Sequence, residues 1–87
     1  MAYNITFSPD AWADYLYWQT EDKKTLKRIN KLLRELQRDG AVQGTGKAEL
    51  LRRGKGMSKR IDDKNRLTQV MEDGSLIILS CRGHYED

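Results

Sequence analysis

The sequence predicts an α+β domain, and three observations carry this prediction. Apolar residues recur at helical spacing between residues 23 and 38, a Ser-Pro-Asp helix start precedes them, and three strand-like runs follow residue 57. The order is therefore strand, helix, helix and an antiparallel β-meander, which predicts helices packed on one face of a sheet. A chain of 87 residues fits one small domain, so we expect residues 1–87 to form a single unit.

The N-terminal strand and the first helix are expected within residues 3–20. Residues 3–7 place Ile5 and Phe7 on one face, as in a short strand. Ser8-Pro9-Asp10 then provides a capping hydroxyl, a proline suited to the first helical position and an acid beside the positive helix end. The first helix is expected to continue to about Thr20.

A second helix is expected from Lys23 to about Arg38. Asp22 is its predicted cap, and Asp39-Gly40 ends it because Gly40 tolerates a left-handed conformation. Its apolar stripe consists of Leu26, Ile29, Leu32, Leu33 and Leu36. The opposite face is cationic and reads either as a solvated helix face or as a nucleic-acid surface.

The remaining residues are predicted to form a loop and then the meander. Residues 41–56 are rich in glycine and read mostly as loop, with a short ordered piece at 49–51. Three strands are expected at Met57–Ile61, Arg66–Met71 and Ser75–Arg82, and Asp73-Gly74 is a hairpin signal between the last two.

Composition and charge exclude several classes of protein. No apolar run is long enough to span a membrane, and we expect no signal peptide. One Cys and one His leave no Cys/His zinc site and no internal disulfide, so no metal or other cofactor is expected. The net charge is +3, but residues 44–71 hold eight Lys or Arg against three Asp or Glu. Such a segment attracts a phosphate backbone.

Three side chains could together cleave RNA without a metal. A phosphodiester cleavage by the 2′-hydroxyl needs a base, an acid for the leaving oxygen and a cation at the phosphate, roles that Glu49, His84 and Arg66 can fill in that order. Each of the three residues also has a non-catalytic interpretation. Glu49 and Arg66 could be surface charges, and a single His is more often an exposed or packed residue.

The chain resembles a known family across nearly its whole length. The segments that carry the resemblance are DAWADYLYWQTEDKKTLKRINKLL at 10–33, GTGKAELL at 44–51, SKRIDDKNRL at 58–67 and SCRGHY at 80–85. They are similar to the YoeB-type toxins of the RelE superfamily, which are ribosome-dependent mRNA interferases. The resemblance implies a RelE-like microbial ribonuclease fold and the toxin of a bacterial type II toxin–antitoxin system.

The resemblance also implies roles for named residues. Glu49 corresponds to the general base, His84 to the general acid, Arg66 to the cation at the scissile phosphate, and Tyr85 to the residue that places the substrate. Arg52 and Arg60 match phosphate-contacting positions, and Lys47 and Lys59 complete the expected RNA-binding set. The implied partners are a YefM-type antitoxin and the 70S ribosome, whose A site presents the mRNA beside rRNA. The resemblance also implies that the chain acts in the bacterial cytoplasm, and it is compatible with a homodimer.

Three departures from the family pattern stand near these residues. Met57 replaces an aromatic residue, and Asn65 and Gln69 replace the His and Tyr of a His-Arg-Leu-Val-Tyr segment. These changes predict a retained fold with weakened activity. The alternative is a non-catalytic ribosome- or RNA-binding homologue that mainly binds its antitoxin.

Overall fold

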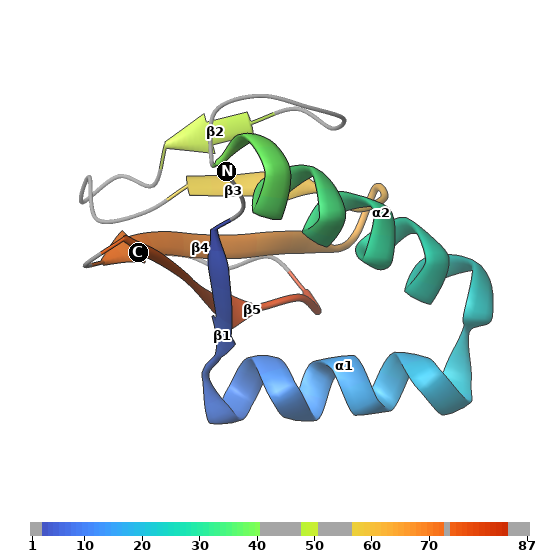
Figure 1. The fold of residues 1–87 in the computed structure, drawn as a ribbon. Coiled ribbons are helices and arrows are strands. Elements are labelled where there is room, and N and C mark those ends of the chain that lie inside the picture. Colours follow the sequence, from blue (N-terminus) through green and yellow to red (C-terminus); the bar gives the residue numbers. More distant parts are fainter. Residues whose placement is uncertain (1–2, 41–47, 51–56, 73, 84–87) are drawn as a thin grey trace.

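The computed structural model describes residues 3–40, 48–50, 57–72 and 74–83, with only the backbone for residues 48–50. Its sheet has five strands in the order β1-β5-β4-β3-β2, with two helices after the first strand (Figure 1). The elements are β1 Asn4–Phe7, α1 Pro9–Glu21, α2 Lys23–Asp39, β2 Ala48–Leu50, β3 Met57–Arg60, β4 Arg66–Glu72 and β5 Ser75–Ser80. The predicted α+β class, element order and meander are confirmed.

The strand β5 lies inside the sheet, between β1 and β4. It is parallel to β1 and antiparallel to β4, while β3 is antiparallel to both β4 and β2. The short ordered piece expected after α2 is thus the edge strand β2. In Figure 1, α2 lies in front of the sheet and α1 runs along its lower side.

Short-range capping explains why the helices begin and end where they do. The Ser8 hydroxyl accepts from the Ala11 N–H at 3.1 Å and donates to the Leu79 carbonyl at 3.0 Å, so the cap also ties α1 to β5. Asp22 ends α1 through its own N–H and begins α2 through its carboxylate. Gly40 ends α2 at φ 83°, which confirms its predicted role.

The Asp22 carboxylate makes the stability of α2 dependent on pH. It accepts from the Thr25 hydroxyl and from the Thr25 and Lys24 N–H groups, and these bonds lower the pKa of Asp22. A lowered folded pKa stabilises the protein above the unfolded value of about 4 and stops doing so as pH falls through the folded value. We expect Asp22→Asn, which caps without titrating, to lose less stability than the wild type between pH 5 and pH 3. Urea unfolding at both pH values measures this, and equal losses would contradict it.

The core lies between the helices and one face of the sheet. The buried apolar residues that form it are Ala11, Trp18, Ile29, Leu32, Leu36, Ile61, Leu67, Leu76, Ile78 and Cys81. Cys81 is fully buried. Burial, with a smaller contribution from Asp14, raises the pKa of this thiol to about 12.

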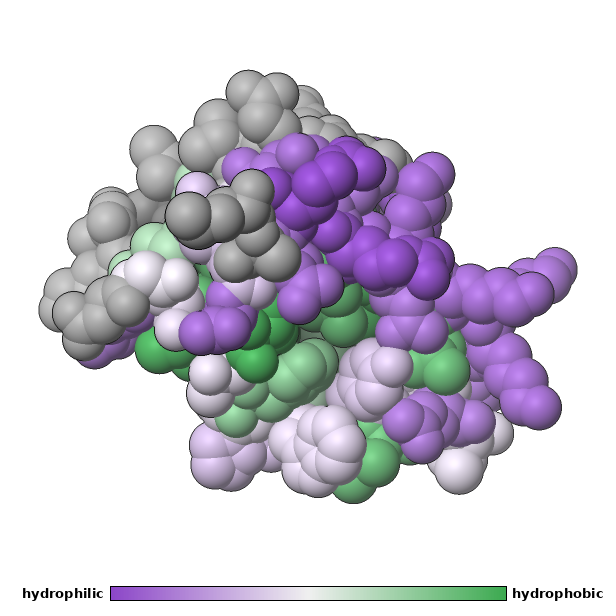
Figure 2. All heavy atoms as spheres, in the orientation of Figure 1, coloured by the Kyte–Doolittle hydropathy of each residue, from purple (hydrophilic) through white to green (hydrophobic). Residues whose placement is uncertain are grey.

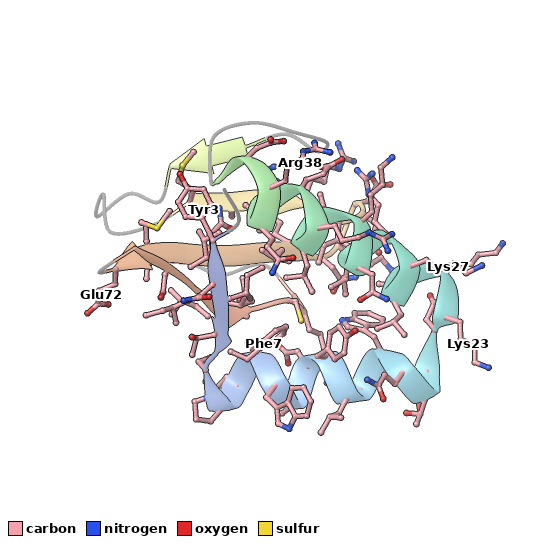
Figure 3. All side chains as sticks on the ribbon, viewed as in Figure 1. Tyr3, Phe7, Lys23, Lys27, Arg38 and Glu72 are labelled. Atoms are coloured by element: carbon pink, nitrogen blue, oxygen red, sulfur yellow. The ribbon has the colours of Figure 1, made fainter. Side chains whose placement is uncertain are left out.

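The outer face of α2 is strongly cationic. Hydrophilic side chains gather over this helix in Figure 2, and Lys23 and Lys27 project away from the molecule in Figure 3. Exposed cations continue along the same helix at Lys24, Lys31, Arg34 and Arg38. No helix among the described residues is long and apolar enough to cross a membrane.

Candidate functional site

Arg66 is a buried arginine held against the neighbouring strand. Only 8% of it is exposed, and it is the first residue of β4. Its Nε donates to the Ser58 hydroxyl at 2.8 Å, and its Nη2 lies 3.3 Å from the Ser58 carbonyl oxygen. These bonds fix the direction of the guanidinium group, which is the condition for binding an anion at a defined place.

This arginine lies on the sheet face that the helices leave uncovered. Lys59 is opposite Leu67 across β3 and β4, and Leu67 belongs to the core beneath the helices. Because side chains alternate along a strand, Ser58 and Thr68 lie on the other face, together with Arg66. At the end of the strands where Arg66 lies, this face is polar although it is largely buried.

Strand pairing brings the position of Glu49 next to this arginine. In the register of β2 and β3, Glu49 is opposite Ser58, the residue that holds Arg66. Directly opposed residues in antiparallel strands lie about 5 Å apart. The side chain of Glu49 lies outside the described residues, so its contacts are not defined, but its backbone is one strand away from the partner of Arg66.

The backbone also brings the segment before His84 to Arg66. The Arg66 N–H donates to the Gly83 carbonyl at 2.9 Å, and the Gly83 N–H donates to Asn65 Oδ1 at 2.8 Å. Gly83 has φ 76°, a conformation that glycine adopts readily. His84 and Tyr85 follow directly in the sequence and lie outside the described residues. Three distant chain segments therefore meet around Arg66.

A second arginine stands opposite the first. Arg60 pairs with Arg66 in the register of β3 and β4, and its guanidinium forms an ion pair with Asp63. Like charges directly opposite each other are unfavourable in a sheet. Here the Arg60 guanidinium is neutralised by Asp63 and that of Arg66 is held by Ser58, so the strand pairing places two cations at the same end of the sheet. Lys47 and Arg52, the other expected RNA-binding residues, lie outside the described residues.

Lys59, one of the expected RNA-binding residues, lies on the side of the sheet that the helices cover. It is fully buried on the helix side of the sheet. Burial lowers the pKa of Lys59, while the nearby carboxylates of Glu35 and Asp39 on α2 act in the opposite direction. A side chain on this side cannot reach a nucleic acid at the outer surface, so Lys59 is removed from the candidate RNA-binding residues. Its packing under α2 is the reason.

A bulge in β5 completes the polar face. Thr68 pairs with Ser80 and Gln69 with Ile78, so Leu79 is an extra residue without a partner on β4. The bulge turns Ser80 to the side of Thr68. Among the described residues, neither hydroxyl has a hydrogen-bond partner. Sequence reasoning missed this hydroxyl row, since alternation from Ile78 would have placed Ser80 under the helices.

The part of the chain that the structure describes contains no group of three or more His, Cys, Asp or Glu residues that could hold a metal ion. The described part of the site offers guanidinium groups and hydroxyls.

Comparison with known proteins points to one family. A family profile described as "YoeB-like toxin of bacterial type II toxin-antitoxin system" matches residues 7–85. The toxin YoeB of Escherichia coli K12 is 40% identical over 83 residues, which cover 93% of this chain and 98% of that toxin.

Solved structures agree as well. The YoeB dimer of Staphylococcus aureus has a TM-score of 0.88 and 44% identity, covering 98% of this chain and 100% of that one. The toxin in a heterotetrameric YoeB–YefM complex from the same organism has a TM-score of 0.84 and 44% identity, with the same coverage. A fold of this kind, matched over nearly all of both sequences, shows that the chain belongs to the YoeB-like toxins of bacterial type II toxin–antitoxin systems.

Proposed function

We propose that this chain is the toxin of a type II pair and that it cleaves mRNA in the A site of the ribosome. The observation that carries the proposal is the fixed guanidinium of Arg66. Ser58 holds it on the polar sheet face; Glu49 is opposite Ser58 in β2, and the backbone N–H of Arg66 binds the Gly83 carbonyl. The exposed cations of α2 offer a second surface for rRNA, since phosphate backbones bind Lys and Arg.

The reaction needs no cofactor in this proposal. Glu49 removes the proton of a ribose 2′-hydroxyl, whose oxygen then bonds to the adjacent phosphorus. Arg66, with Arg60 beside it, stabilises the negative charge of the phosphorane. The bond from phosphorus to the 5′-oxygen breaks, and His84 protonates that oxygen while Tyr85 orients the substrate. The products are a 2′,3′-cyclic phosphate and a 5′-hydroxyl.

The proposed regulatory partner is a YefM-type antitoxin. The relatives from Staphylococcus aureus support it, since one forms a complex with YefM and another is a dimer of YoeB. We extend both forms of assembly to this chain. A cytoplasmic site of action follows from a ribosomal target.

Purified chain added to mRNA-programmed 70S ribosomes is expected to cut the mRNA and leave the two ends named above. Glu49→Gln and His84→Gln should each abolish cutting but retain ribosome binding, because each change removes a proton-transfer group and leaves the cationic surface intact. Primer extension and end-group analysis measure the cut, and ribosome pelleting measures binding.

Two results would count against this function. Wild-type chain that binds ribosomes without cutting would favour the binding-only homologue. Rapid cutting of naked RNA would contradict the dependence on the ribosome, which we expect because so small a site leaves substrate orientation to the ribosome.

A further inference from the structure

We propose that Asn65 is a positioning residue for His84. Its side-chain carbonyl binds the Gly83 N–H and so sets the course of the chain into the proposed general acid. The inference rests on the proposed function, since it assigns Asn65 a part in that reaction. Family resemblance alone makes this position a departure, because a His is usual there.

The side chain of Asn65 has a defined orientation. Its Nδ2 lies 3.0 Å and 3.1 Å from the two carboxylate oxygens of Asp62. A carboxylate only accepts hydrogen bonds, so the amide NH₂ has to face Asp62 and the amide carbonyl has to face away. That carbonyl oxygen is the atom that lies 2.8 Å from the Gly83 nitrogen.

Asp62 is itself held by the turn between β3 and β4. One of its oxygens accepts from the N–H groups of Lys64 and Asn65, each at 2.8 Å. Burial of Asp62 opposes ionisation, but the hydrogen bonds from Lys64 and Asn65 outweigh it and lower the pKa of Asp62. The turn is thus a rigid base for the Asn65 amide.

Both backbone groups of Gly83, its N–H and its carbonyl, are hydrogen-bonded. The Asn65 side chain binds its N–H, and the Arg66 N–H binds its carbonyl. Cys81, two residues earlier, is held from α1, where Trp18 Nε1 donates to the Cys81 carbonyl at 2.9 Å and Asp14 accepts from the Cys81 N–H at 3.0 Å. The segment 81–83 is therefore clamped between α1 and the β3–β4 turn.

The consequence concerns the distance between acid and phosphate. Because Asn65 and Arg66 are consecutive, the same turn positions the guanidinium and the backbone that leads to His84. Loss of the Asn65 bond frees one side of Gly83 while Arg66 stays on Ser58. A displacement of about 1 Å between reacting groups can cost about 100-fold in rate.

The test compares Asn65→Ala with a matched change in the same turn, Lys64→Ala, whose side chain does not bind Gly83. On mRNA-programmed ribosomes, Asn65→Ala should lower kcat by about 10- to 100-fold and leave KM within about 2-fold of the wild type. Lys64→Ala should keep the wild-type kcat. The double variant Asp62→Asn/Asn65→Asp exchanges the amide and the carboxylate but keeps an acceptor for Gly83, so it should recover most of the lost kcat.

A second readout is independent of activity. The Gly83 amide should exchange its hydrogen at least about 10-fold faster in Asn65→Ala than in Lys64→Ala, since it loses its acceptor. His84 is the only histidine, so its imidazole signals in NMR spectra report its surroundings directly, and they should shift in Asn65→Ala alone.

The outcomes separate the two proposals. Wild-type kcat in Asn65→Ala, or unchanged Gly83 exchange, overturns the role of Asn65 and leaves the proposed function standing. A wild-type chain that binds ribosomes without cutting overturns the proposed function, and the Gly83 and His84 signals then decide whether Asn65 holds this segment.

Discussion

Replacing Arg66 with Ala is expected to slow ribosome-dependent mRNA cleavage by about 100- to 1,000-fold, the usual loss when a fixed donor to transition-state charge is removed. The guanidinium is held by Ser58 and is only 8% exposed, so it does not reorganise when charge develops on the phosphate. Single-turnover cleavage on saturating ribosomes measures the chemical step. The loss should appear in the rate, and ribosome binding should change little.

Arg66→Lys is the matched control. It keeps the positive charge but not the planar group that reaches Ser58, so its rate should fall between those of the wild type and Arg66→Ala. Arg66→Ala also leaves the Ser58 hydroxyl without its donor and costs some stability, so thermal unfolding is needed to show that the variant is folded at the assay temperature. If the folded Arg66→Ala variant cleaves mRNA at a rate within about 3-fold of the wild type, Arg66 does not stabilise the charge of the transition state, and the proposed mechanism is wrong on this point.

Replacing Gln69 with Met is expected to stabilise the protein, which is the reverse of most core substitutions. Gln69 is 1% exposed, and neither its amide nitrogen nor its amide oxygen has a hydrogen-bond partner among the described residues. A buried polar group without a partner costs about 1–3 kcal/mol, and Met fills a similar volume without that cost. We expect a gain of about 2 kcal/mol and a rise in Tm of roughly 10 °C for a domain of this size.

Calorimetry or urea unfolding measures this gain. Gln69→Glu is the control, since it has nearly the same shape but brings a charge into the same place, and it should destabilise. An unchanged or lower Tm in Gln69→Met would mean that the Gln69 amide makes a hydrogen bond that stabilises the folded protein. Cleavage by Gln69→Met should match the wild type, because the residue faces the helices.

Strand pairing gives two of the departures from the family pattern a common explanation. Met57 and Gln69 are directly opposite each other across β3 and β4, on the same side as Leu67. The family pattern that the sequence resembles places an aromatic residue at each position, and in this chain the cross-strand pair is Met57 and Gln69. Such pairs stabilise sheets through side-chain contact. Both positions therefore lie on the helix side of the sheet, on the face opposite to Arg66.

Local signals explain why much of the fold could be predicted from the sequence. Ser8, Asp22 and Gly40 act through neighbours a few residues away, so the ends of both helices could be read from the chain. The stripe from Leu26 to Leu36 gave the buried face of α2 for the same reason. Strand limits were also close, apart from the end of β5, which stops at Ser80.

Long-range register explains why the site could not be completed from the sequence. Nothing near Lys59 in the chain shows that it faces the helices while its neighbour Ser58 holds Arg66. Nothing near Asn65 shows that its amide reaches Gly83, 18 residues away. The bulge at Leu79 reverses a face that simple alternation would assign. These facts depend on which strands pair and in what register.

The position of β5 between β1 and β4 has a consequence for synthesis. Neither neighbour can complete its pairing until Ser75–Ser80 has left the ribosome, and Leu76 and Ile78 enter the core only at that moment. A chain that lacks Ser75–Ser80 has both helices and the other four described strands but not the strand that joins β1 to β4. The sheet can therefore close only after β1, β2, β3 and β4 have all been made.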